Sequence, residues 1–451
     1  MFKRFTKGCV SMVERYLPDP FLFATILTII VFISGIIFTG QSAIAMIGHW
    51  SDGFWKLLAF SMQMALVLVT GHVLAKAPII ERGIRAIASI PKSKKGAVGL
   101  VSVVSIVACW INWGFGLVIG TLIAKEVAKK VKDVDYRLLI ATGYAGFLVW
   151  HAGFSGSIPL KVASATEDLA KMTKGALTAP VPTSETIFAP MTLIPMAIIL
   201  ILMPLISIAM TPSKEDTISI DPSLLEDTKQ PKPDKSTMTP ADRMENSSVI
   251  SMIIGAMGLV YIVNYFANNG FKLNLNIVNF TFLFLGIILH YTPRNFLNAV
   301  KVAIKGTAGI LIQFPFYAGI MGMMVGAGEG TTSLAAQMSN FFVGISNKTT
   351  FPLFSFISAG VVNIFVPSGG GQWAVQGPIM MPAGQLLGVP AAKTAMSIAW
   401  GDAWTNLIQP FWALPALGIA GLNAKDIMGF CLVNLIVFGF VIGLCLMFIP
   451  V

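Results

Sequence analysis

The chain has 451 residues, of which 55% are hydrophobic and only 12% are charged. Because a soluble domain carries about 25% charged residues, this composition excludes an ordinary soluble protein, a disordered chain and a secreted disulfide scaffold. The formal charge of +10 is explained by basic loops at a lipid bilayer, so we expect no nucleic-acid partner. The four cysteines show no metal-ligand spacing, and we expect no cofactor.

The N-terminal segment is basic, with Lys3, Arg4 and Lys7, and an apolar run follows it. Because that run is long and the motif Leu17-Pro-Asp-Pro20 precedes it, we interpret it as an uncleaved first helix and not as a signal peptide. Basic segments stay on the cytoplasmic side of a membrane. We therefore expect a cytoplasmic N-terminus.

Apolar segments then recur along the whole chain, and a helix of about 20 apolar residues crosses a bilayer. Four further stretches (97–124, 137–165, 350–388 and 391–421) are apolar but interrupted by Gly, Pro, Asn and Ser, as in broken helices surrounded by protein or water. The fold class is therefore an all-α polytopic membrane protein with about nine to eleven transmembrane helices. The uninterrupted candidates are Phe21–Phe38, Phe54–Ala75, Ile187–Met210, Val249–Phe266, Ile277–His290, Thr307–Gly326 and Ile427–Ile449.

The charges of the loops predict which side each loop faces. The loop 40–53 has no Lys or Arg and is expected outside, whereas 76–96 has six basic residues against Glu81 and is expected inside. The stretch 97–124 ends at a second basic segment, 125–137. Because it begins and ends on one side and is broken near its middle, it is predicted to be a re-entrant helical hairpin.

Residues 211–246 form a long polar linker, rich in Pro, with five basic and eight acidic residues. Counting helices places this linker in the cytoplasm. It divides the chain into two halves, 1–210 and 247–451. It contains no phosphate-binding loop, so nothing there indicates an ATP-driven pump.

The two halves resemble each other at an offset near 250 residues. Asn112, before Trp-Gly-Phe-Gly, corresponds to Asn363, before Ile-Phe-Val-Pro-Ser-Gly-Gly-Gly, and Trp150 corresponds to Trp400. Both halves have the same order of helix, hairpin, Trp and broken helix. The first repeat has its hairpin at 97–124 and its broken helix at 137–165, and the second repeat has them at 350–388 and 391–421.

Loop charge indicates that the second repeat is inverted in the membrane. The basic loop 76–96 precedes the first hairpin, but the loop 327–349 before the second hairpin holds only Glu329 and Lys348 as charged residues. Equivalent elements are therefore expected on opposite sides. Inverted repeats whose broken helices meet near mid-membrane are the architecture of secondary transporters.

Each break offers groups that suit a small anion and a light cation. Half-helix N-termini present free N–H groups and the positive end of a dipole, and unwound carbonyls with Asn, Ser and Thr oxygens suit Na⁺. The alternative is that the glycines serve only close helix packing. The candidate substrate-binding residues are Asn112, Gly114, Gly116, Ser155, Ser157, Asn363, Ser368, Gly369, Gly370, Trp400, Thr405 and Asn406, with Na⁺ at Asn112, Asn363 and Thr405.

Asp402 is the only acidic residue between positions 350 and 421, and an intramembrane carboxylate is a functional hypothesis by default. Together with Asn112 and Asn363 it is a candidate for cation coupling; the alternative is an interfacial Asp in water. His151, directly after Trp150, stays open, and Lys161 is interpreted as a loop lysine. Seven of the nine tryptophans lie in the interrupted segments, either as interfacial anchors or as a wall for a small acyl chain.

Several longer segments resemble the short-chain fatty acid transporter family of bacterial inner membranes, over nearly the whole chain. The resemblance implies uptake of short-chain monocarboxylates such as butyrate or acetoacetate, with an inner-membrane location. By analogy with the wider ion-transporter superfamily, it also implies coupling to Na⁺ or H⁺, elevator-like alternating access and a homodimer. The segments are Leu17-Pro-Asp-Pro-Phe21, Asp52-Gly-Phe-Trp-Lys-Leu-Leu-Ala-Phe60, Ile111-Asn-Trp-Gly-Phe-Gly116, Gly153-Phe-Ser-Gly-Ser157, Gln313-Phe-Pro-Phe-Tyr-Ala-Gly319, Val366-Pro-Ser-Gly-Gly-Gly371 and Gln409-Pro-Phe-Trp-Ala-Leu-Pro415.

Other functions stay open from the sequence. A dicarboxylate carrier of the same superfamily is the nearest alternative, although no basic residue lies between Asn363 and Pro382 to bind a second carboxylate. An anion channel is a further alternative function. The sequence Gly153-Phe-Ser-Gly156 also fits the GxSG pattern of intramembrane serine proteases, but such a short match arises easily by chance and we do not expect an enzyme.

Overall fold

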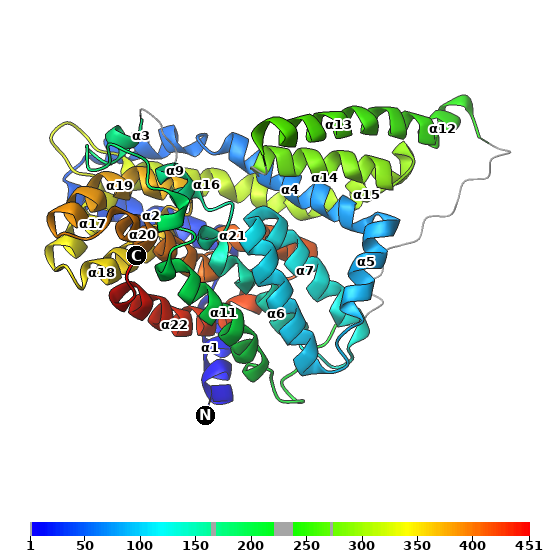
Figure 1. Ribbon diagram of the computed structural model, residues 1–451, viewed down its shortest axis with the longest axis horizontal. Helices are drawn as coiled ribbons and strands as arrows, with labels where there is room; N and C mark the ends of the chain where they lie inside the picture. Colours follow the sequence, from blue (N-terminus) through cyan, green and yellow to red (C-terminus); the bar gives the residue numbers. More distant parts are fainter. Residues whose placement is uncertain (1, 164–167, 221–237, 271–273) are drawn as a thin grey trace.

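The computed structural model describes residues 2–163, 168–220, 238–270 and 274–451. Over these ranges the regular structure is entirely helical (Figure 1). Residues 221–237 of the predicted linker 211–246, and the last two residues of the predicted stretch 137–165, lie outside the described residues. The helices of the first half are α1 (Phe2–Tyr16), α2 (Pro20–Thr39), α3 (Ala43–Phe54), α4 (Leu58–Lys76), α5 (Pro78–Ala88), α6 (Lys94–Ile111), α7 (Trp113–Lys130), α8 (Tyr136–Ala145), the 3₁₀ helix η1 (Gly146–Ala152), α9 (Ser157–Val162), α10 (Asp168–Met172), η2 (Thr183–Glu185) and α11 (Pro190–Ala209).

The second half repeats much of this order. A hairpin of two helices, α18 (Phe351–Phe365) and α19 (Gly369–Leu386), is again followed by a helix that breaks. Both hairpins follow a long apolar helix and a shorter one. The helices are α12 (Pro240–Glu245), α13 (Ser248–Asn269), α14 (Leu275–Leu289), α15 (Pro293–Ala303), η4 (Ile304–Thr307), α16 (Ala308–Val325), α17 (Leu334–Gly344), α18 (Phe351–Phe365), α19 (Gly369–Leu386), α20 (Ala391–Thr405), η5 (Asn406–Ile408), α21 (Pro410–Ala420) and α22 (Ala424–Phe448).

Many helices are long and apolar enough to cross a bilayer, as the composition predicted. Eight such segments occur among the described residues, and α14, α18 and α21 are shorter apolar helices. Large apolar side chains of α2 and α13, such as Ile37 and Val260, are exposed, as expected for helices that face lipid. The chain is therefore a multi-pass membrane protein.

Residues 40–53, predicted to be a loop, contain the helix α3. Ser42 begins it by accepting a hydrogen bond from the N–H of Ala45 at 3.2 Å, and α3 then packs along α16. A Cβ atom on Gly53 would lie 2.8 Å from the Cα of Gly322, so the two backbones approach as closely as glycine allows. The prediction was wrong because α3 is too short to register as a span. The predicted span from Phe54 begins only at Leu58, because Phe54 is the last residue of α3 and a turn at 55–57 separates the two helices.

The predicted loops 76–96 and 327–349 also contain helices, α5 and α17. Pro78 stands in the first turn of α5, where its missing N–H costs nothing. Ser333 begins α17 by accepting a hydrogen bond from Ala336 N–H at 3.3 Å. Charge identified these segments as outside the apolar spans, but charge alone carries no information about short helices between spans.

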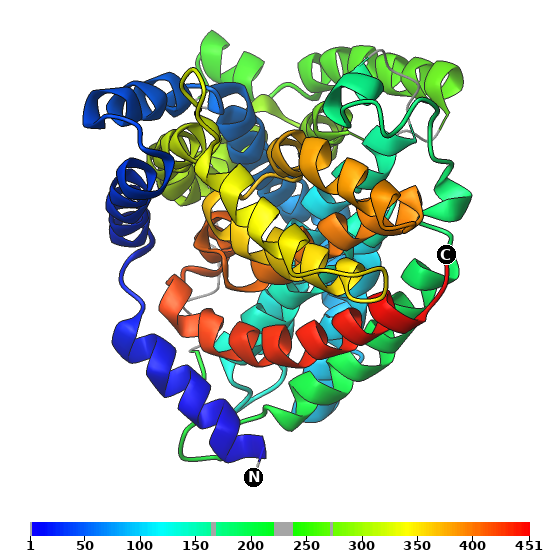
Figure 2. The same cartoon turned by 90° about the vertical axis from the view of Figure 1, so that its left-hand side faces the viewer.

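Three segments that were predicted to share the cytoplasmic side lie together in the structure. The N-terminal helix α1 packs against α22 (Figure 2). Lys7 Nζ lies 2.6 Å from Asp216 Oδ1, and Arg137 Nη1 lies 2.7 Å from Glu14 Oε1. The hydrogen bond from Lys7 lowers the pKa of the Asp216 carboxyl. These ion pairs join the N-terminus, the basic segment 125–137 and the start of the linker on one face.

Helix packing divides into an outer layer and a core that contains the breaks. The helices α13, α14 and α15 stack beside α4 at one edge of the molecule (Figure 1). In the core, α6 packs against α7 and η1, and α18 packs against α20. The 3₁₀ segment η1 also contacts α20, so the broken helices of the two halves meet.

Candidate functional site

The first hairpin turns at Asn112, which is buried between α6 and α7. Its Oδ1 accepts a hydrogen bond from Phe115 N–H at 3.0 Å and so caps α7. The next N–H group, that of Trp113, donates to Ser155 Oγ at 3.0 Å. Ser155 therefore ties the break after η1 to the tip of the first hairpin.

The other candidates of the first half differ in what they contact. Gly114 is buried in the first turn of α7. A Cβ atom on Gly116 would press against the backbone of Cys109, so this glycine allows α6 and α7 to pack closely, as in the packing alternative. Ser157 is the first residue of α9 and is partly exposed.

Asn363 lies inside α18 and connects the second hairpin to the break after α20. Its Nδ2 has two N–H groups and lies within hydrogen-bond distance of three acceptors, the backbone oxygen of Asp402 at 2.9 Å, Thr405 Oγ1 at 2.9 Å and Asn406 Oδ1 at 2.6 Å, so one N–H is shared. Thr405 Oγ1 in turn donates to the backbone oxygen of Gly360 at 2.9 Å. The second half therefore also ties its hairpin to its broken helix through a hydroxyl side chain.

The two asparagines nevertheless have different positions. Asn112 is itself the turn of the first hairpin, whereas the turn of the second hairpin is capped by Ser368, whose Oγ accepts a hydrogen bond from Gly371 N–H at 3.3 Å. The Ser155 contact and the Asn363–Thr405 contact each span 42 residues. The repeats thus share the connection from hairpin to broken helix but not the capping residue.

His151 and Asp402 form a buried pair across the two halves of the chain. His151 Nε2 lies 3.1 Å from Asp402 Oδ2, both side chains are fully buried, and Asn406 Nδ2 lies 3.3 Å from the same oxygen. Among the described residues, His151 Nδ1 and Asp402 Oδ1 have no hydrogen-bond partner. Asp402 is therefore not an interfacial residue in water, and the pair presents polar atoms that a proton, a cation or a bound molecule could satisfy.

The tip of the second hairpin lies against the first broken helix. A Cβ atom on Gly369 would lie 2.9 Å from His151 Nε2, and one on Gly370 would lie 3.3 Å from Lys161 Nζ. Glycine at these positions allows the start of α19 to approach both side chains. The structure thus brings Lys161, Gly369, Gly370 and the His151–Asp402 pair together at one place.

Several tryptophans form a buried aromatic cluster and are not interfacial anchors. The ring centroids of Trp113 and Trp412 are 5.2 Å apart, and Phe147 stacks on Trp150 at 5.5 Å. The Trp150 ring is also 3.6 Å from the His151 ring. Trp400 is fully buried on α20. The cluster therefore packs beside the site, which leaves the predicted wall for an acyl chain as a hypothesis.

The structure places at the site two residues to which the sequence analysis assigned no role. The sequence left His151 open, and its position at a break of the chain was the signal for it. Lys161, interpreted as a loop lysine, is half-buried on α9 beside the second hairpin. Sequence spacing could not pair it with Gly370, because the two residues are more than 200 positions apart.

The GxSG sequence does not form a nucleophile with its base. Ser155 Oγ contacts Trp113 N–H, and His151 Nε2 contacts Asp402. Within the described part of the chain, no hydrogen bond joins Ser155 to a histidine. A serine hydrolase needs its base within hydrogen-bond reach of the nucleophile, so these contacts give the motif a structural role.

Two broken helices that meet with their hairpin tips in a multi-pass helical protein define a membrane protein of the transporter class. Residues 1–449 match the family described as "Short chain fatty acid transporter". The chain belongs to this family.

Two relatives in bacteria agree with this assignment. The chain is 44% identical to the "Putative short-chain fatty acid transporter" of Escherichia coli (strain K12), covering 99% of this chain and 100% of that protein. It is also 44% identical to the protein of the same name in Haemophilus influenzae, covering 98% and 99%. Among solved structures, the chain is similar to the Alcanivorax borkumensis YdaH transporter, with 13% sequence identity and a TM-score of 0.43. The match covers 95% of this chain and 98% of that chain.

Replacing Asn363 with alanine is expected to lower the free energy of unfolding by about 3 kcal/mol, because the substitution leaves buried oxygens without their donor. The unfolding of the purified protein in detergent, followed by heat or denaturant, measures this loss. The matched control is Asn268→Ala, since Asn268 Nδ2 also bonds a backbone oxygen, that of Asn264 at 2.9 Å, but is exposed. A loss for Asn363→Ala no larger than that of the control would contradict the proposed connection.

Proposed function

We propose that this protein is a secondary active transporter, and not an enzyme, that carries short-chain monocarboxylates such as butyrate or acetoacetate into the cell. Uptake is coupled to Na⁺ or H⁺. The proposal places the protein in a bacterial inner membrane with a cytoplasmic N-terminus, where opposed hairpins alternate access to one central site. The single observation that carries it is the buried His151–Asp402 pair at the point where the breaks of both halves meet.

The chemistry of this site supports a small anion together with a cation. Within the part of the chain that the structure describes, the backbone N–H groups of Gly369 and Gly370, which begin α19, donate to no acceptor. Such groups suit a carboxylate. Asp402 is the acidic side chain beside them, and a buried carboxylate needs a cation or a proton to balance its charge. Loading the cation and the anion together therefore keeps the site close to neutral.

One positive side chain at the second tip favours a single carboxylate over two. Lys161 approaches Gly370, and a dicarboxylate bound there would leave its second charge beside Asp402. Like charges at short range in a site of low dielectric disfavour binding strongly. A dicarboxylate carrier of the same superfamily is the second candidate function, and competition with a four-carbon dicarboxylate decides between the two.

Purified protein in proteoliposomes is expected to accumulate labelled butyrate above its outside concentration when a Na⁺ or pH gradient is imposed. Each gradient is applied separately, so that the coupling ion is identified by the gradient that drives accumulation. Liposomes without protein are the control. Flux without accumulation would indicate a channel, accumulation of a dicarboxylate alone would favour the second candidate, and no flux of any monocarboxylate would refute the proposed substrate.

A further inference from the structure

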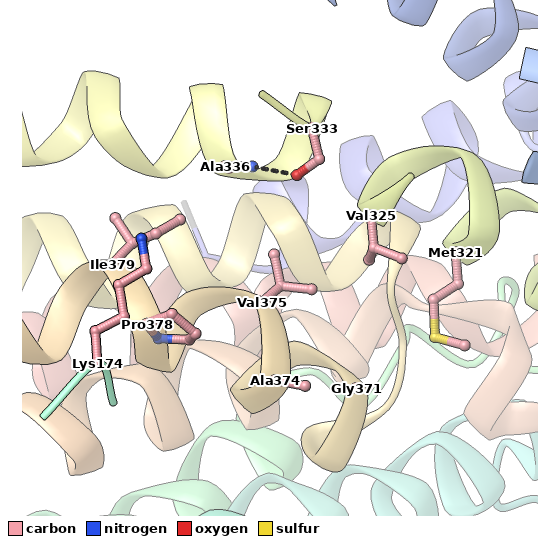
Figure 3. Close-up of a pocket in the computed structure, with 10 residues that line it drawn as sticks. All are labelled: Lys174, Met321, Val325, Ser333, Ala336, Gly371, Ala374, Val375, Pro378 and Ile379. Carbon is pink, nitrogen blue, oxygen red and sulfur yellow. Dashed lines mark hydrogen bonds between the residues drawn. The ribbon is translucent and has the colours of Figure 1, made fainter. Parts of the chain in front are cut away.

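A cavity of about 470 Å³ opens beside the second hairpin, between α16, α17 and α19. Figure 3 shows it running along α19, with Lys174 near Pro378 at one end and Met321 beside Gly371 at the other. Gly371 is the residue whose N–H is capped by Ser368 at the start of α19. The cavity therefore reaches the tip of the second hairpin, one residue from Gly370.

The walls of the cavity are mostly apolar, but a positive charge lies at each end. Met321, Val325 and Val375 supply apolar surface, while Lys174 is exposed at the outer end. Lys161 Nζ lies just beyond the inner end, 3.3 Å from the place of a Cβ atom on Gly370. No carboxylate of a described residue is ion-paired with either lysine.

This combination fits one kind of occupant, a small anion with a short apolar tail. The two ammonium groups attract a carboxylate, and the apolar walls accept a chain of a few carbons. At about 30 Å³ of liquid per water molecule, a cavity of about 470 Å³ has room for several water molecules beside a molecule of a few carbons. The cavity therefore has the size of an entrance through which a hydrated substrate passes. The groups that select a carboxylate lie at its inner end.

We propose that this cavity is the entrance by which a short-chain monocarboxylate reaches the second hairpin, and that Lys161 binds the carboxylate there. The proposal rests on the proposed transport function and on its topology. In that topology α17 and the loop with Lys174 face outward. The structure is then open to the outside, with the acyl chain against α16 and α19 and the carboxylate between Lys161 and the start of α19.

A single introduced cysteine tests the entrance. Ala374 lines the cavity and is exposed, and the four native cysteines are all buried. In the Ala374→Cys variant, a membrane-impermeant methanethiosulfonate added from outside is expected to label the new thiol, and saturating butyrate slows labelling about tenfold. The control is Lys348→Cys, exposed on the same predicted side and outside the cavity, where butyrate has no effect.

Lys161 is tested in the same assay and in transport. Lys161→Gln is expected to raise the KM for butyrate about tenfold, the loss of about 1.4 kcal/mol in binding, and to abolish the protection of the cysteine at position 374. Lys161→Arg is expected to restore most of the affinity for butyrate and most of the protection of the cysteine at position 374. A merely structural lysine would not alter protection by butyrate in a variant that is still folded and labelled.

The outcomes separate the entrance from the transport function. Suppose that the unmodified protein accumulates butyrate, but that Ala374→Cys is labelled equally with and without butyrate, or only from the inside. The proposed entrance is then refuted, and the proposed transport function is not. If Lys161→Gln keeps its KM and its protection, the role of Lys161 is wrong. If the unmodified protein carries no monocarboxylate, the proposed function and this entrance both fail.

Discussion

The Asp402→Asn variant is expected to lose gradient-driven accumulation of butyrate by about a hundredfold, which corresponds to about 2.7 kcal/mol, while it stays folded. Asparagine keeps the size of the side chain and an oxygen that accepts the hydrogen bond of Asn406 Nδ2. What it removes is the charge that pairs with His151 and that a coupling cation or proton would balance. Counterflow of butyrate without a gradient should persist better than accumulation, because exchange does not require net cation movement.

The matched control is Asp52→Asn, the same substitution at an exposed position. This variant should retain accumulation, since its carboxylate is already surrounded by solvent. Uptake is measured in proteoliposomes under separate Na⁺ and pH gradients, and thermal unfolding in detergent verifies that both variants are folded. Unaltered dependence on both cations in a folded Asp402→Asn variant would remove Asp402 from the coupling mechanism.

Replacing Gly401 with alanine is expected to cost about 3 kcal/mol of folding free energy and to abolish transport. The added Cβ atom would lie 2.6 Å from the Cβ of Ala359 and 3.0 Å from the backbone nitrogen of Gly360, and it would also press on the backbone oxygen of Phe356. Because backbone atoms cannot rotate away, α18 and α20 would have to separate. Asp402 follows directly, so the separation would also displace the His151–Asp402 pair.

Gly83→Ala is the control for this prediction. Gly83 is exposed on α5 and nothing lies within 4 Å of its added Cβ. Alanine at an open helical position is expected to stabilise the protein by up to about 1 kcal/mol. Heat or denaturant unfolding in detergent compares the two variants, and a Gly401→Ala protein as stable as the unmodified one would show that α18 and α20 are not held together at this contact.

Much of the helical plan could be predicted from the sequence because it follows from local composition. Predicted spans such as Phe21–Phe38 and Ile187–Met210 differ from α2 and α11 by at most three residues at an end. The breaks at 112 and near 406 were marked by Asn, Gly and Pro, which interrupt an apolar run wherever they occur. The short helices α3 and α17 escaped prediction, because a helix shorter than a span leaves no comparable signal in hydropathy.

The sequence by itself determined that this is a multi-pass helical membrane protein with two similar halves and the family to which it belongs, since hydropathy, breaks and motifs are read residue by residue. Only the tertiary structure decided which polar groups share a site. In the structure His151 pairs with Asp402, and Lys161 lies beside Gly370. Ser368, and not Asn363, caps the helix after the turn of the second hairpin. These pairings depend on how helices from both halves pack, and spacing along the chain does not encode that packing.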